Sequence, residues 1–279
     1  MTRTPSTARR IRPTLLAPLF AGLIAVAGIA AVPAPADTAP AAEAAAASAE
    51  ATTTTRTLRA APTPAPRAAV APALLDALRA AAPTLDAEVL EMALAARDRA
   101  RADEGVTSPI LSVIDYSLPS SERRLWVFDT DRRELLFHEL VAHGKNTGDK
   151  FARHFSNDNG SLQSSLGLFK TADTYYGKNG YSLRLHGLER GVNHLALPRT
   201  IVIHGADYVS EEWVKRHGRI GRSWGCPAVR SEIARDYIDT IKGGSLVFSY
   251  YPDENWLASS TYLADYRANR GTDRIATAR

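Results

Sequence analysis

Cys226 is the only cysteine in the chain, and its thiol is the strongest nucleophile that the sequence offers. In its thiolate form such a group attacks a carbonyl carbon and holds the acyl group as a thioester. A lone cysteine in a folded protein is by default a small buried apolar residue. The residue type alone therefore leaves a structural role and a catalytic role open, and the surrounding sequence has to distinguish them.

The residues around Cys226 predict a tight turn followed by a helix. Residues 221–229 read Gly-Arg-Ser-Trp-Gly-Cys-Pro-Ala-Val. Gly225 permits a strained turn, and Pro227 suits the first position of a helix whose apolar spacing continues over 228–241. Because a helix N-terminus stabilises a thiolate, we expect a lowered pKa for the Cys226 thiol, and backbone N–H groups there that can hold an oxyanion.

A cysteine nucleophile needs a base, and all seven histidines precede Cys226 in the sequence. Papain-like peptidases have the opposite order, with the cysteine first, so the chain is not of that type. His204 is the best candidate because it ends the apolar run 200–203, which is typical of a buried strand. A histidine at a strand end is held rigidly, and we expect the carbonyl group of Gly205 to orient its imidazole ring.

Other residues near this pair are expected to shape the site. Four of them are expected to orient it or to hold an oxyanion: Gly205, Ser223, Trp224 and Gly225. Four more are candidates for substrate binding: Arg222, Arg230, His186 and Tyr208. An arginine can pair with a substrate carboxylate, although an exposed arginine is usually solvated. His143 could line the same cleft, and because the histidines lack metal-ligand spacing we expect no metal and no cofactor.

The elements that must position these residues are mostly short strands. Residues 110–116 are apolar and β-branched, and residues 125–128 and 135–142 are joined through a polar turn in a hairpin pattern. Further strands are expected at 166–170, 183–185, 200–204 and 245–250. Short strands separated by loops rich in Gly, Asn and Asp predict a compact, mainly β domain with appended helices.

One helix and one long loop are expected around these strands. The helix covers about 84–104, with Thr84 as its N-cap and apolar residues every three or four positions. The stretch 144–191 is rich in glycine and polar residues, with aromatic residues between them. Such a stretch either faces a substrate as an ordered surface or is a decorated loop that its aromatic residues hold in place, and both interpretations stay open.

The first 36 residues have the pattern of an export signal. Four arginines precede an uncharged apolar run over about 13–32, and Ala-Pro-Ala follows at 34–36. We expect a mature start near Asp37, with an uncleaved membrane anchor as the alternative, because the run is close to the ~20 residues that span a bilayer. In either case the folded part faces outward, where a cysteine without a disulfide partner favours a reactive use.

The charge of the chain excludes one class of partner. The formal net charge is +4, and residues 1–36 carry four arginines and no acidic residue, so the remainder is balanced. A polyanion such as a nucleic acid is bound by a basic patch, which the remainder lacks. We therefore expect no nucleic-acid partner.

Composition divides the rest of the chain into four parts. Residues 37–72 contain mostly Ala, Pro and Thr and are expected to form a disordered tether, because they cannot bury enough apolar surface to fold. A helical segment is expected over 73–105, and a mainly β domain with enough apolar residues for one core over 106–257. Residues 258–279 are polar, rich in Arg and Asp, and expected to be loosely ordered.

Two short segments resemble the L,D-transpeptidase catalytic domain of the YkuD type: His204-Gly205 and, further along, Ser223-Trp224-Gly225-Cys226. The resemblance covers about 110–250 and includes Ser-Ser-Leu-Gly-Leu-Phe at 164–169, which is similar to the family's Thr-Pro-x-Gly-x-Phe element. It implies a mainly β fold, a cysteine thioester intermediate and peptidoglycan stem peptides as substrate.

The resemblance also implies a reaction. Cys226 attacks the carbonyl group of a meso-diaminopimelate residue and expels the terminal D-alanine. A side-chain amine of another stem then takes the acyl group, which gives a 3→3 cross-link. His204 accepts and returns the proton, and the backbone over 224–226 holds the oxyanion. Such an enzyme acts outside the cytoplasm, in the periplasm or the cell wall.

The chain departs from the commoner family pattern at the nucleophile. That pattern has Ser-His-Gly-Cys followed by an apolar residue and then Arg or Asn, whereas here Trp224 replaces the histidine and Pro227-Ala228 follow Cys226. The departure leaves the acyl acceptor open. One alternative is hydrolysis of the same stems by an L,D-carboxypeptidase or endopeptidase; another is a non-catalytic wall-binding module in which Cys226 is structural. The sequence indicates no oligomeric state.

Overall fold

The computed structural model describes residues 70–277, with side chains as far as Arg270. The expected export signal or anchor, 1–36, and nearly all of the expected tether, 37–72, lie outside the described residues. None of the helices within 70–277 is long and apolar enough to cross a membrane.

One sheet dominates the described part of the chain. Its eight strands have the order β3-β2-β1-β8-β4-β5-β6-β7, and all neighbours are antiparallel except the parallel pairs β1–β8 and β6–β7. The strands are β1 Ile110–Asp115, β2 Leu125–Asp129, β3 Glu134–Glu139, β4 Gly167–Gly177, β5 Gly180–Gly187, β6 Val202–Gly205, β7 Ala228–Val229 and β8 Leu246–Tyr250. The predicted mainly β fold is confirmed. The long loop predicted over 144–191 contains the hairpin β4–β5, so only its flanks are loop.

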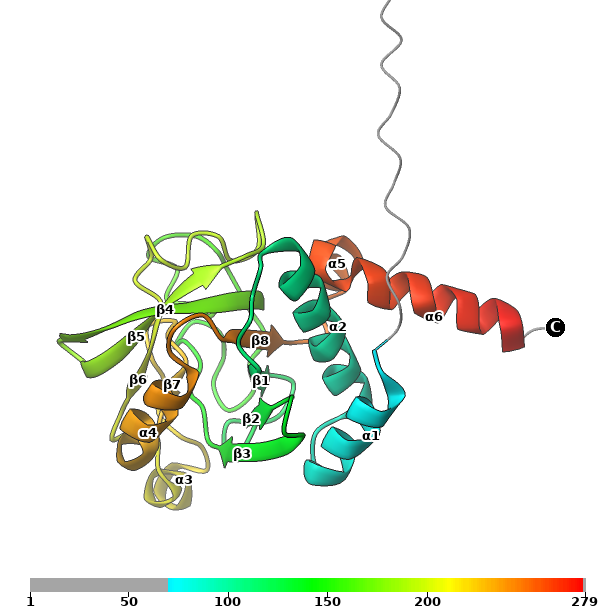
Figure 1. The fold of residues 1–279 in the computed structure, drawn as a ribbon. Helices are drawn as coiled ribbons and strands as arrows, with labels where there is room; N and C mark the ends of the chain where they lie inside the picture. Colours follow the sequence, from blue (N-terminus) through cyan, green and yellow to red (C-terminus); the bar gives the residue numbers. More distant parts are fainter. Residues whose placement is uncertain (1–69, 278–279) are drawn as a thin grey trace, which may run out of the picture. The chain divides into compact units, whose positions relative to one another are not determined.

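Helices cover the sheet, and they explain why β1 is buried on both of its faces. The helices are α1 Pro72–Ala81, α2 Ala87–Asp103, α3 Glu211–His217, α4 Ser231–Ile241, α5 Glu254–Ser259 and α6 Ala264–Thr277, with the 3₁₀ turn η1 Thr261–Leu263. In Figure 1, α2 runs beside β1 and β8, and α4 lies at the β6–β7 end. Because α2 and α4 both contact β1, its residues from Leu111 onward are all buried rather than alternating.

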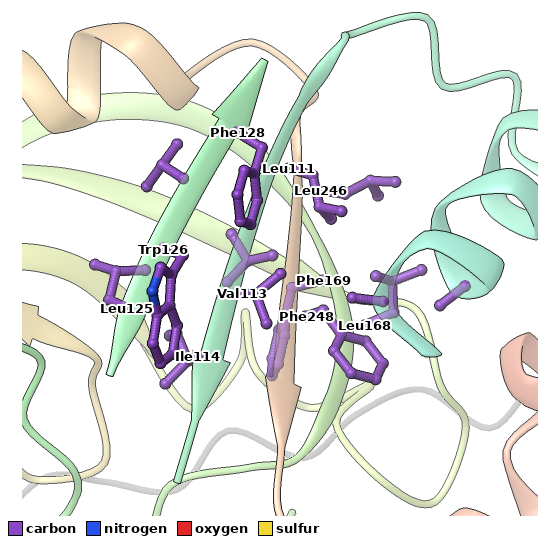
Figure 2. Packing of buried hydrophobic residues seen from close by; sticks show 14 of the residues in the cluster. Leu111, Val113, Ile114, Leu125, Trp126, Phe128, Leu168, Phe169, Leu246 and Phe248 are labelled. Atoms are coloured by element: carbon purple, nitrogen blue, oxygen red, sulfur yellow. The ribbon is translucent and has the colours of Figure 1, made fainter. Parts of the chain in front are cut away.

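The core is centred on β1, β2 and β8. Figure 2 shows Val113, Trp126 and Phe248 packed side by side from these three strands, and all three are fully buried. Large aromatic and branched side chains on adjacent strands remove much apolar area from water, which is the main stabilising contribution to such a core. The central strands are therefore a rigid base for the loops at their ends.

The N-cap predicted for the first long helix is wrong by two residues. Thr84 lies in the turn before α2, and the carboxylate of Asp86 accepts hydrogen bonds from the backbone N–H groups of Glu88 (2.8 Å) and Val89 (3.2 Å). A cap must precede the first helical residue directly, and the helix begins at Ala87, so Asp86 is the residue in position to satisfy those donors.

The loose order expected after Leu257 is also wrong over the described residues. The chain there forms η1 and α6, and Tyr262 and Leu263 are buried against α2. Two tyrosine hydroxyls donate to carboxylates of α2 and its C-cap, from Tyr262 to Glu104 (2.9 Å) and from Tyr266 to Glu88 (2.6 Å). The polar composition of this segment does not predict a helix, because the helix is stabilised by a few aromatic side chains whose partners lie far away in the sequence.

Candidate active site

A single pocket of about 410 Å³ brings most of the predicted site residues together. Of the ten predicted residues, six line it: His204, Tyr208, Arg222, Ser223, Trp224 and Cys226. The histidine lies in β6 and the cysteine in the turn just before β7, its neighbour at one edge of the sheet. In the parallel pair β6–β7, His204 is in register with Ala228, which follows Cys226 closely in the chain. The register of these two short strands therefore places the thiol and the imidazole in the same pocket.

His204 is held in one orientation by its own strand. Its Nδ1 lies 2.8 Å from the carbonyl oxygen of Gly205, as expected from the sequence. Because a carbonyl oxygen only accepts, Nδ1 carries the proton and Nε2 is left as a free acceptor. The residue is 5% exposed, and this burial lowers the pKa of His204, an effect that the Gly205 contact partly offsets. A neutral imidazole with a free Nε2 is the form that accepts a proton.

The helix N-terminus predicted at Cys226 is absent. Ala228 and Val229 form β7, which pairs with β6, and helix α4 begins only at Ser231. Pairing with β6 is favoured over the helix that the spacing predicts, because it buries Ala228 and Val229 fully. Their carbonyl groups accept hydrogen bonds from the backbone N–H groups of Ala142 (2.8 Å) and Ala206 (2.9 Å). A helix dipole therefore does not act directly on the thiol, and the predicted lowering of its pKa by this cause is wrong.

The thiol of Cys226 instead lies against the start of β6. The backbone N–H group of Val202 donates to Sγ at 3.5 Å, and the thiol donates to the carbonyl oxygen of Thr200 at 3.7 Å. Burial raises the pKa of the Cys226 thiol, while the Val202 N–H group and the guanidinium of Arg199 act in the opposite direction. The net shift is upward, so at neutral pH Cys226 is a thiol beside a neutral His204.

Hydrogen bonds within the turn fix the backbone around Cys226. The hydroxyl of Ser223 donates to the carbonyl oxygen of Cys226 at 2.6 Å and accepts from the N–H group of Gly225 at 3.1 Å. The backbone of Ser223 also pairs with the segment after β3, donating to the His143 carbonyl oxygen (3.0 Å) and accepting from Lys145 N–H (2.8 Å). Ser223 thus hydrogen-bonds within the turn, as expected.

Gly225 is required where three loops meet. Its φ of +125° lies in the range that favours glycine, and a Cβ there would fall 2.8 Å from the carbonyl oxygen of Gln163. The hydroxyl of Ser164 donates to the Gly225 carbonyl oxygen at 3.0 Å and accepts from the Gly144 N–H group at 3.0 Å. Gly225 does not line the pocket itself, and its role in the fold is close approach of the backbone.

Three predicted contacts with the cleft are not found. Arg230 lies outside the pocket lining, and its guanidinium forms a two-point pair with Glu139 (2.8 and 2.6 Å), so a protein carboxylate already satisfies it. His186 is exposed on β5, outside the pocket lining. His143 is fully buried with Nδ1 2.7 Å from Nη2 of Arg124, and burial, reinforced by that charge, lowers its pKa to about 3.

Several residues that line the pocket are not predicted from the sequence, because no motif marks them. They come from the long polar stretch and from the residue before the apolar run of β6: Asn159, Gly160, Leu162, Lys178, Asn179 and Arg199. Their position favours the substrate-facing interpretation of that stretch. The charged side chains among the described lining residues are Lys178, Arg199 and Arg222, all cationic, with no carboxylate.

The mouth of the pocket carries an exposed aromatic ring. Trp224 is 71% exposed although it directly precedes the turn glycine, and the Lys145 ammonium lies 6.0 Å from its ring centroid. An exposed tryptophan beside a cationic pocket offers a flat apolar face to a ligand. Within the described residues, no group of three or more His, Cys, Asp or Glu side chains is arranged to hold a metal ion.

Comparison with known proteins gives one family. The sequence model of the L,D-transpeptidase catalytic domain matches residues 81–250, more than half of the chain. No curated protein matches.

Solved structures that resemble the chain do so at low identity. An L,D-transpeptidase from Mycobacterium smegmatis is 15% identical over 51% of this chain and 59% of its own, with a TM-score of 0.32. An L,D-transpeptidase from Stackebrandtia nassauensis is 14% identical over 64% and 76%, with a TM-score of 0.31. The helical cell shape determining protein Pgp2 from Campylobacter jejuni is 10% identical over 56% and 55%, with a TM-score of 0.35. The chain thus spans 59% of the Mycobacterium smegmatis protein.

Proposed function

The chain belongs to the L,D-transpeptidase catalytic domain family, and from this premise we propose that it is a cysteine acyltransferase that acts on peptidoglycan stem peptides. The observation that supports the proposal is that Cys226 and His204 line one pocket, with Nδ1 of the histidine hydrogen-bonded to the Gly205 carbonyl oxygen. The catalytic domain in this proposal is the segment 106–257.

The first half-reaction forms a thioester. Nε2 of His204 takes the proton of the Cys226 thiol, and the sulfur attacks the carbonyl carbon of a diaminopimelate residue. The tetrahedral intermediate collapses when the bond to the terminal D-alanine breaks, and the imidazolium gives its proton to the departing amine. The pocket is left with an acyl group on sulfur and a neutral histidine.

The second half-reaction transfers the acyl group. The side-chain amine of another stem attacks the thioester and loses a proton to Nε2, and the thiolate leaves and recovers that proton. The product is a 3→3 cross-linked dimer, and the enzyme returns to a thiol and a neutral imidazole. Because the upward pKa shift of Cys226 and the downward shift of His204 both favour this neutral pair, charge separates only during turnover.

Backbone donors beside the nucleophile support stabilisation of the oxyanion. Among the described residues, the backbone N–H groups of Trp224 and Cys226 have no hydrogen-bond partner, whereas that of Gly225 is engaged by Ser223. Free donors on a fixed turn can meet the charge that develops on the attacked carbonyl oxygen without reorganisation. The hydrogen bonds of Ser223 hold this turn in place.

The charge of the pocket is suited to such a substrate. Stem peptides carry free carboxylates, and the charged residues that line the pocket are Lys178, Arg199 and Arg222. Arg222 is partly committed, because its Nη1 lies 3.3 Å from the Asp149 carboxylate and donates to the Gly148 carbonyl oxygen at 3.0 Å. Lys178, at the exposed turn of the β4–β5 hairpin, is the more available cation for a substrate carboxylate.

We also propose that the protein acts after export, in the periplasm or the cell wall, with residues 1–36 as a signal or a membrane anchor. The N-terminal pattern of arginines followed by an apolar run supports this location.

Product analysis tests the proposed reaction. Purified protein and its Cys226→Ala variant are incubated with tetrapeptide-stem muropeptides, and the products are resolved by mass. Dimers that form only with Cys226 intact are the expected result. Shortened monomers alone would identify water as the acceptor and the protein as a hydrolase. No Cys226-dependent product would contradict catalysis and favour a wall-binding module.

A further inference from the structure

Arg199 is a buried cation in the pocket of Cys226, and the two half-reactions above give it no part in the chemical steps. Arg199 is only 8% exposed, whereas Lys178 in the same pocket is exposed. Its hydrogen bonds all go to neutral oxygen atoms rather than to a carboxylate. A buried charge without a close counter-ion is costly, so its retention beside a nucleophile points to a use.

The guanidinium is not free to grip a substrate carboxylate. Nη1 donates to the Ser156 carbonyl oxygen (2.7 Å) and to Ser165 Oγ (2.5 Å), while Nη2 donates to Ser161 Oγ (3.1 Å) and to the Gln163 carbonyl oxygen (2.7 Å). These bonds occupy the four N–H groups of the fork that would otherwise bind a carboxylate at two points. The positive charge is therefore fixed in place, and it acts through space.

The residues that follow Arg199 surround the sulfur of Cys226. The carbonyl oxygen of Thr200 accepts from the thiol, and the N–H group of Val202 donates to Sγ. Thr200 has φ of +56°, a conformation that a β-branched residue rarely adopts. Such strain persists where the surrounding structure imposes it, commonly at functional sites. The segment 199–202 thus supplies an acceptor and a donor that contact the thiol, and a cation that lines the same pocket.

We propose that Arg199 is a positioning residue whose buried charge stabilises the Cys226 thiolate after the thiol proton has passed to His204. The S–H bond breaks, Nε2 gains the proton, and the sulfur keeps the electron pair in the pocket that the fixed guanidinium also lines. This inference rests on the proposed function of Cys226 as the nucleophile. It gives to Arg199 the part that a helix N-terminus plays at other reactive cysteines.

The other groups near the thiol do not supply this charge. Tyr116 and Tyr208 are neutral, because burial raises the pKa of each to about 12. His204 is neutral until it receives the proton. Asp158 is an exposed carboxylate that acts on Arg199 from a distance, and water weakens its effect. Among the described residues, Arg199 is the charged group that lowers the pKa of the Cys226 thiol.

The pH dependence of alkylation measures this effect without turnover. The full chain carrying His204→Gln is used, so that the imidazole does not titrate together with the thiol. The rate of Cys226 alkylation by iodoacetamide is followed against pH in that background and with Arg199→Gln, Arg199→Lys or Lys178→Gln added. Thermal melting confirms that each variant is folded. Lys178→Gln is the matched control, because it removes an exposed cation from the same pocket.

Arg199→Gln is expected to raise the thiol pKa by about one unit, which lowers the alkylation rate about tenfold at pH values below it. Arg199→Lys keeps the charge but loses the fork of N–H groups that donates to four oxygen atoms. Its alkylation rate is expected to stay within a few-fold of that of the parent, as is the rate of Lys178→Gln. An Arg199→Gln pKa equal to that of the control would overturn the proposal. A Cys226 thiol pKa raised by a full unit in Arg199→Lys would also overturn it, because the effect would then come from the hydrogen bonds to residues 156–165 rather than from the charge. This second comparison can be made even if Arg199→Gln does not fold.

The same measurement separates this proposal from the proposed function. If wild-type protein forms cross-linked products but Arg199→Gln leaves the thiol pKa unmoved, only the role of Arg199 fails. If wild-type protein forms no Cys226-dependent product, the proposed function fails, and the Arg199 proposal fails with it because the thiolate would then have no use.

Discussion

The hydroxyl of Ser223 lies 2.6 Å from the carbonyl oxygen of Cys226 and also accepts the N–H group of Gly225 at 3.1 Å, so one small side chain closes the turn that carries the thiol. Both contacts are buried, so water does not replace Ser223 as the partner of the Cys226 carbonyl oxygen or of the Gly225 N–H group. The position of the nucleophile therefore depends on a residue that need not touch the substrate.

Replacing Ser223 by alanine is expected to loosen this turn. The buried Cys226 carbonyl oxygen and Gly225 N–H group lose their partner, which should lower the free energy of unfolding by about 1–3 kcal/mol and slow acylation of Cys226. Chemical denaturation and single-turnover acylation measure the two effects. Ser259→Ala is the control, because the Ser259 hydroxyl is exposed on α5 and bonds only to carbonyl groups of its own helix. Equal stability of the two variants would contradict the assigned role of Ser223.

Gly225→Ala is expected to cost more stability than a glycine replacement of similar backbone conformation elsewhere. At Gly225 the new methyl group would meet the Gln163 carbonyl oxygen at 2.8 Å and the Ile201 side chain at 3.0 Å. At Gly218, the C-cap of α3, φ is also positive (+72°) but nothing lies within 4 Å, so only the left-handed conformation is penalised, by about 1–2 kcal/mol. Denaturant midpoints compare the variants, and a Gly218→Ala loss as large as that of Gly225→Ala would show that close packing at the turn is unimportant.

The sequence predicted those parts of the fold and site that depend on local pattern. The strands are predicted because β-branched and apolar residues recur within runs bounded by turn residues, and the position of His204 near the end of a strand is predicted because it follows such a run. The short strand β7 was missed because two residues are too few to show a period, and the pairing that forms it involves β6, earlier in the chain. Arg199 was missed for the same kind of reason, since Ser156 and Ser165, which its guanidinium binds, are 43 and 34 positions away.

Turnover is expected to be nearly constant over a wide range around neutral pH. The acid limb reports protonation of His204, and because burial lowers its pKa, the limb should lie below the ordinary value of 6.5. The alkaline limb reports loss of the thiol proton from Cys226, whose pKa is raised above 9.0. The rate of Cys226-dependent product formation against pH measures both limbs. An acid limb above pH 6.5 would contradict a resting neutral imidazole, and would instead suit a thiolate–imidazolium pair.

His143 is expected to make the fold sensitive to acid. Its pKa is lowered from 6.5 to about 3 in the folded state, first by burial and then by the Arg124 guanidinium, while the unfolded chain takes up a proton near pH 6.5. The unfolded state therefore binds more protons between these two values, so stability falls as pH falls from about 6.5 towards 3, by at most about 4–5 kcal/mol from this residue. The raised pKa values of the buried Asp115 and Glu189 act in the opposite direction and reduce the net slope.

His143→Gln isolates this contribution, because glutamine keeps an acceptor for Arg124 and does not titrate. Urea denaturation of wild type and variant between pH 7 and pH 4 gives the free energy of unfolding at each pH. The variant is expected to lose less stability over this range than the wild type, even if it is less stable at pH 7. Parallel curves would show that His143 is protonated in the fold, which would require the 2.7 Å contact between its Nδ1 and Arg124 to break in acid.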